Sequence, residues 1–91
     1  MTREVFAPAT LTVGFHDNEV LAVVGKNHSA YVDVANIRAE RLPERGDLIE
    51  GQVKVYLIEA GADDSLVELP GVAVGALRGR VANSLLREVG E

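Results

Sequence analysis

The feature that most constrains this chain is an alternation of apolar and polar residues, with a period of two, between short turns. In "TLTVGFHD", residues 10–17, Leu11, Val13 and Phe15 alternate with small or polar residues. The same alternation returns in "DLIEGQVKVYLIE", residues 47–59. Successive side chains of a β-strand point to opposite faces, so this pattern predicts strands with one face in a core and the other in solvent.

Turn residues divide the chain into about five such strands. Between the two stretches above lie "EVLAVVG" and "SAYVDVANI", and "LVEL" follows them. The separating segments "HDNE", "GKNHS", "LPERGD" and "AGADDS" are rich in Gly, Pro, Asn and Asp, which favour turns. The order predicts an antiparallel meander. "EVLAVVG", residues 19–25, is apolar on both faces and is therefore expected in the middle of the sheet.

The end of the chain has a different pattern. Apolar residues recur every three or four positions, at Val74, Leu77, Val81, Leu85 and Val89. This is the spacing of one face of an α-helix, and it predicts a helix over residues 72–89.

Three glycines, Gly71, Gly75 and Gly79, recur at every fourth position where this segment begins. Each glycine within a helix costs about 1 kcal/mol relative to alanine, so we expect the helix to become firm only after residue 76. The spacing indicates either local flexibility or a close approach of another backbone, which glycine permits.

These patterns together predict an α+β fold with about five antiparallel strands in a curled sheet or small barrel, followed by one C-terminal helix. The chain has 91 residues, of which 47% are hydrophobic, which suffices for one core. We expect a single domain over residues 1–91. Within it, residues 1–9 are expected to form a short arm, residues 10–69 a β-rich body and residues 72–89 the helical segment.

The charge balance and the absence of cysteine exclude several classes of function. The formal net charge is −5, with nine Lys and Arg among fourteen Asp and Glu. A stand-alone nucleic-acid binder usually carries a basic stripe instead. A chain without cysteine has no disulfide, no thiolate nucleophile and no Cys-ligated zinc. No segment approaches the roughly 18 apolar residues of a membrane span, and no signal peptide is visible. We therefore expect a soluble, cytoplasmic protein with no membrane partner.

The two histidines do not indicate a catalytic or metal site. His16 and His28 lie at turns on either side of the second strand. That strand would separate them by roughly 20 Å, at a rise of about 3.3 Å per residue. The sequence contains no G-x-S-x-G motif and no EF-hand spacing. We therefore expect no catalytic, metal-binding or cofactor-binding residue and no enzymatic activity.

Acidic residues around the "AGADDS" loop form one candidate binding surface. Carboxylates gathered at an exposed loop favour binding to a protein with a basic surface, because complementary charge raises the rate of association. The predicted partner-binding residues are Glu59, Asp63, Asp64 and Glu68.

Basic residues in the middle of the chain form an alternative surface. They would serve as the local patch of an S1-like or OB-like nucleic-acid-binding domain. Acids interleaved with the arginines neutralise part of their charge, which weakens this interpretation. The residues concerned are Arg38, Arg41, Arg45 and Lys54.

Residues 14–58 resemble the KfrB-type domain of plasmid and mobile-element proteins. The stretch "DNEVLAVVGKNHSAYVD…RLPERGD" follows that pattern: an acid, a Val-rich strand, a Gly-basic turn, a strand ending in Asp, and Arg-apolar-Pro-x-x-Gly-acid before a last strand. The chain departs from it at Val32, where the family tends to carry His. The resemblance implies a small accessory protein of a plasmid or phage, and it assigns no catalytic residue to this chain. The matching positions are Asp17, Val20, Val24, Gly25, Lys26, Asp33, Arg41, Pro43, Gly46 and Asp47.

We therefore expect a non-enzymatic interaction protein that binds a protein partner. Three settings fit: an accessory domain of a mobile element that forms homodimers, a phage-encoded inhibitor such as an anti-CRISPR protein, and an immunity or antitoxin protein. The sequence does not choose among them. The alternative is the nucleic-acid-binding domain described above, although nucleic acid is the less expected partner.

Overall fold

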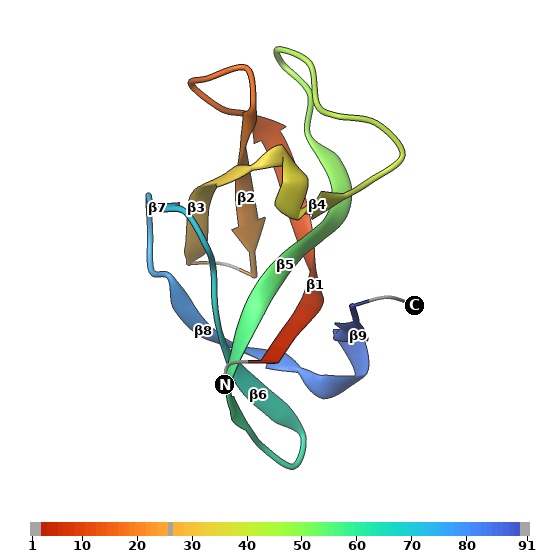
Figure 1. Cartoon of the computed structure of the whole chain (residues 1–91), viewed down its shortest axis with the longest axis vertical. Helices are drawn as coiled ribbons and strands as arrows, with labels where there is room; N and C mark the ends of the chain where they lie inside the picture. Colours follow the sequence, from red (N-terminus) through yellow and green to blue (C-terminus); the bar gives the residue numbers. More distant parts are fainter. Residues whose placement is uncertain (1–2, 26, 90–91) are drawn as a thin grey trace.

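The computed structural model describes residues 3–25 and 27–89, which form one curled antiparallel sheet (Figure 1). The strands follow the order β7-β3-β2-β1-β5-β6-β8, while β4 pairs with β5 and β9 pairs with β1. Their bounds are β1 Arg3–Val13, β2 Glu19–Val24, β3 His28–Asp33, β4 Ile37–Arg38, β5 Ile49–Ala60, β6 Asp64–Glu68, β7 Val72–Ala73, β8 Arg78–Ala82 and β9 Arg87–Glu88. Two short 3₁₀ turns are η1, Val34–Asn36, and η2, Asn83–Leu85. Together the strands form a half-barrel.

The two longest strands, β1 and β5, form the backbone of the sheet. Their ladder begins with Arg3 opposite Leu57 and continues for nine consecutive pairs. Residues 3–9, expected to belong to an arm, are therefore the first part of β1. Pro8 is tolerated because β2 pairs with β1 only from Thr10 onward and β9 pairs with it only at Val5 and Phe6, so Pro8 itself pairs with β5 alone.

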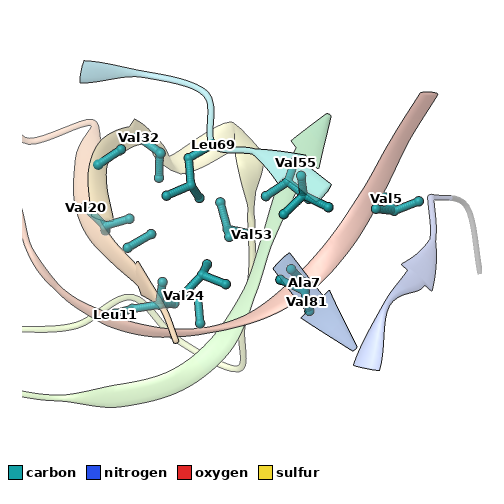
Figure 2. Close-up of a cluster of buried hydrophobic side chains, with 14 residues drawn as sticks. Val5, Ala7, Leu11, Val20, Val24, Val32, Val53, Val55, Leu69 and Val81 are labelled. Atoms are coloured by element: carbon teal, nitrogen blue, oxygen red, sulfur yellow. The ribbon is translucent and has the colours of Figure 1, made fainter. Parts of the chain in front are cut away.

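The core consists of the alternate side chains that point into the curl. Leu11, Val20, Val32 and Val53, from four different strands, are each at most 3% exposed. Figure 2 shows them around one interior that the curled sheet encloses. Burial of a Val or Leu side chain contributes about 1.5–3 kcal/mol. Burial of the apolar residues that alternate along the strands is therefore the main source of stability.

The predicted C-terminal helix over residues 72–89 is wrong, and so is the α+β fold class. Strands β7, β8 and β9 and the turn η2 occupy this segment, and the described residues contain no α-helix. Within β8, Arg78 and Arg80 are exposed while Val81 is only 7% exposed. This is the period of a strand, and the fold is all-β.

Pairing with a distant strand explains why the helical spacing did not produce a helix. Strand β8 pairs with β6 along its whole length, from Arg78 opposite Glu68 to Ala82 opposite Asp64. Glycines at two positions of the segment weaken a helix further. The spacing of residues within one segment does not show that pairing with a distant strand will stabilise it. The helical spacing alone was therefore misleading.

Residues 71–79 cross from one edge of the sheet to the other and lie against β3. Gly71 has a φ of 90°, and a Cβ there would lie 2.0 Å from the carbonyl oxygen of Tyr31. A Cβ at Gly79 would lie 1.5 Å from Nε2 of His28. Both positions therefore require glycine in this arrangement. We call these two contacts the glycine seam.

Backbone hydrogen bonds hold the same crossing segment on β3. The N–H groups of Val74 and Gly75 both donate to the carbonyl of Ser29 at 3.1 Å, and that of Ala76 donates to the carbonyl of Asn27 at 3.0 Å. The edges of the sheet formed by β3 and by β8 are thereby brought together.

The glycine seam predicts that Gly79→Ala destabilises the protein and that His28→Ala relieves the effect. The new methyl group would occupy the space of the imidazole, and overpacking of this kind costs about 1–3 kcal/mol. Urea unfolding of both single variants and of the double variant measures the free energies of unfolding and their coupling.

Gly71→Ala is the matched comparison, because its obstacle is the backbone carbonyl of Tyr31 and not a side chain. We expect Gly71→Ala to be the more destabilising change and to gain nothing from His28→Ala. If the effect of Gly79→Ala were the same with and without His28, the imidazole would not be the obstacle.

Candidate functional site

Three of the four acids predicted to bind a partner are paired with arginines of the chain itself. Arg80 bonds Asp64 at 2.9 Å and Glu59 at 3.4 Å, and Arg78 bonds Glu68 at 2.7 Å. Asp64 first, and then Glu59, raise the pKa of Arg80. Such exposed pairs stabilise the fold little. They do, however, offset the negative charge that was expected to face a partner.

Asp63, the fourth acid, lies in the exposed turn between β5 and β6. Asn83 fastens this turn to η2, since its amide donates to the carbonyls of Gly61 at 2.9 Å and Ala62 at 3.3 Å. The hydroxyl of buried Ser65 donates to the side-chain oxygen of Asn83 at 2.5 Å. The chain's own polar groups therefore order the acidic loop, and their contacts indicate a structural role for it.

The four basic residues of the alternative prediction are divided between two places. The guanidinium carbon of Arg38 lies 4.0 Å from the centroid of the Phe6 ring, and Lys54 lies opposite Phe6 in the β1–β5 register. Arg41 and Arg45 lie instead in the exposed loop that precedes β5. The structure does not gather the four into a single track for a phosphate backbone.

The two histidines have different surroundings. His16 is exposed in the turn after β1, whereas His28 is half-buried against Gly79. Its Nδ1 is enclosed without a hydrogen-bond partner among the described residues. Within residues 3–25 and 27–89, no group of three or more His, Asp and Glu side chains is placed to hold a metal ion.

A cleft of about 520 Å³ lies between the first half of β1 and the C-terminal segment. Polar side chains on its walls are bonded within the chain: Ser65 to Asn83, Arg3 to Glu88 in an ion pair, and Arg87 to the carbonyls of Ser84 and Leu86. A substrate pocket requires polar groups that converge on a ligand. These groups do not provide such a set.

The outside of β2, β3 and β7, in contrast, presents an exposed apolar face. Leu21 lies opposite Tyr31, and Tyr31 lies opposite Val72, so the three form a row across the strands. Phe15 packs on Tyr31 with ring centroids 5.0 Å apart. Phe15 is 80% exposed and Val72 is 66% exposed. The outer apolar face, as we name it, consists of Phe15, Leu21, Val23, Tyr31, Val72 and Val74.

The folding of β2 and β3 explains why these side chains point outward. Val20, Ala22 and Val24 are buried in the core, so the alternate residues of β2 must face the other side. No helix and no second sheet among the described residues packs on that side. In Figure 1, β7 and β3 lie side by side, with β2 next in the sheet.

Two carboxylates lie at one end of the outer apolar face. Glu19 and Asp33 are directly opposite each other in the β2–β3 register, one outward-facing pair beyond Leu21 and Tyr31. Neither forms an ion pair with another described residue. The alternation alone did not identify this rim, because it depends on how two strands pair. The apolar character of both faces of β2 was the one signal for the face itself.

Comparisons with protein-family models, with curated proteins and with solved structures find no match for this chain. The resemblance to the KfrB-type domain therefore stays a prediction, and function is inferred from geometry. In residues 3–25 and 27–89 no helix is both long and apolar enough to cross a membrane.

The contacts of Asp47 in the loop that carries Arg41 predict how stability depends on pH. Arg41 donates to Asp47 at 2.7 Å and the Glu44 N–H donates to it at 3.0 Å, which lowers the pKa of Asp47 below its ordinary value. A carboxyl with a lowered folded-state pKa contributes stability above its unfolded pKa, and that stability is lost as the pH falls through the folded value. We expect Arg41→Ala to raise the pKa of Asp47, measured by an NMR titration of the carboxyl carbons.

Arg45→Ala is the matched control, since Arg45 lies in the same loop but is not paired with Asp47. Arg45→Ala should leave the pKa of Asp47 unchanged. Equal shifts in the two variants would point to the net charge of the loop and not to the hydrogen bond from Arg41.

Proposed function

We propose that this chain is a non-enzymatic interaction module that binds a protein partner through the outer apolar face. The observation that carries the proposal is the continuous row of Leu21, Tyr31 and Val72, capped by the exposed ring of Phe15. Contiguous exposed apolar surface on a small protein marks sites of association. Aromatic side chains are enriched at the centres of such interfaces.

This proposal places the contact away from the acids that the sequence indicated. Arg78 and Arg80 offset three of those four charges, so that end of the sheet offers a partner less negative charge than expected. The proposed main contact surface therefore does not include Glu59, Asp63, Asp64 and Glu68.

A cytoplasmic setting and a plasmid or phage origin belong to the same proposal. An accessory domain, a phage inhibitor and an immunity protein all act by occupying a partner's surface. An apolar face on a small rigid sheet suits each of them, because a pre-formed surface loses little conformational entropy on binding.

The proposal predicts that Phe15→Ser and Val72→Ser each weaken partner binding by about tenfold or more, as expected for central interface residues. The immobilised protein is exposed to bacterial lysate at low and moderate salt, with and without nuclease treatment. Retained proteins are identified by mass spectrometry, and retained nucleic acid is measured in the untreated samples. The dissociation constant is then measured for each purified partner with the same variants. Because both positions are exposed, the thermal midpoint should change little.

Leu85→Ser is the matched control, since Leu85 is 50% exposed but lies in η2, outside the outer apolar face. It should leave partner binding unchanged. A partner that binds all three variants equally well would overturn the proposed surface. Recovery of nucleic acid that is lost in Arg38→Ala and Lys54→Ala variants would favour the nucleic-acid alternative instead.

A further inference from the structure

We infer that the partner presents lysine or arginine side chains beside an apolar centre. This inference rests on the proposed function and adds the chemistry of the partner. It starts from Glu19 and Asp33, which face outward, directly opposite each other, at the end of the outer apolar face. Asp17 is also exposed, in the turn that precedes Glu19.

The opposed carboxylates are unfavourable for the isolated sheet. Like charges directly opposite each other on neighbouring strands destabilise the pair. Each carboxylate accepts only a local backbone hydrogen bond: Glu19 from the N–H of Phe15 at 3.3 Å, and Asp33 from the N–H of Ala35 at 2.8 Å. No cation of the described chain pairs with either of them.

The other end of the sheet shows that this chain can neutralise its acids. There, Arg78 pairs with Glu68 across β6 and β8, and Arg80 lies between Asp64 and Glu59. The structure thus pairs three carboxylates at that end of the sheet and, among the described residues, leaves Glu19 and Asp33 unpaired beside the outer apolar face. An external cation would remove the repulsion between Glu19 and Asp33 and gain two ion pairs.

The exposed ring of Phe15 favours the same partner. The apolar stem of a Lys or Arg side chain can cover the ring while its charged head reaches the carboxylates, and a cation over an aromatic face is attracted to it. A second copy of this chain fits poorly. Two copies joined by this face would bring four carboxylates of Glu19 and Asp33 together on chains that each carry a net charge of −5.

A pair of blocked six-residue peptides tests the inference, one of alternating Val and Lys and the other of alternating Val and Glu. Each is titrated into the ¹⁵N-labelled full chain, and amide shifts of Leu21, Tyr31 and Val72 report binding to the face. We expect the Val–Lys peptide to bind about fivefold or more tightly, the size of two exposed ion pairs. That preference should disappear in the variant Glu19→Gln/Asp33→Asn.

The control variant Glu4→Gln/Asp63→Asn makes the same change in net charge away from the face and should keep the preference. Binding of both peptides with equal affinity, or a preference that survives Glu19→Gln/Asp33→Asn, would overturn the inference and leave the proposed function standing. Shifts on the face from neither peptide would overturn the docking surface, and with it the proposed function. A dilution series without peptide completes the test, because concentration-dependent shifts on the face would assign it to a second copy.

Discussion

The close approach of residues 71–79 to β3 at Gly71 and Gly79 is the constraint on which the rest of the structure depends. Strands β1 to β3 and β5 to β6 are joined by turns that bring neighbours together, but nothing in those turns unites β3 with β8. The crossing segment does so, and it lies so near β3 that a side chain at either glycine would overlap Tyr31 or His28. Without this seam, β3 would be an open edge with unpaired backbone groups, because its pairing with β7 would be lost.

The same seam creates the candidate site. By holding β7 against β3, it sets Val72 opposite Tyr31 and so extends the apolar row of β2 and β3 by one strand. The other end of the crossing segment continues into β8, whose arginines neutralise the acids of β5 and β6. One segment therefore determines both where apolar surface is exposed and where negative charge is offset.

Local patterns in the sequence were sufficient for the strands whose partners are their neighbours. The alternation around Leu11 located β1 from residue 10 onward, and the alternation after residue 47 located β5. The first part of β1, which pairs with the distant strand β5, was instead expected to be an arm. The turn residues separated β1, β2 and β3. The C-terminal segment could not be predicted in this way, because the spacing of Val74, Leu77 and Val81 fits a helix. The segment forms a strand because it pairs with β6, and the local spacing does not show that pairing. The recurrent glycines carried the missing information, but their contacts with β3 are visible only in the fold.

The outer apolar face follows from an imbalance within β2. A strand that is apolar on both faces needs something to pack against each face. Neighbouring strands of the sheet do not provide this, because they lie beside the strand and not above or below it. The curled core covers Val20, Ala22 and Val24. Leu21 and Val23 face the other way, where no described element packs against them. The prediction that β2 lies inside the sheet was correct, but it explained only one of its two apolar faces. The second face is the one that the proposed partner would cover.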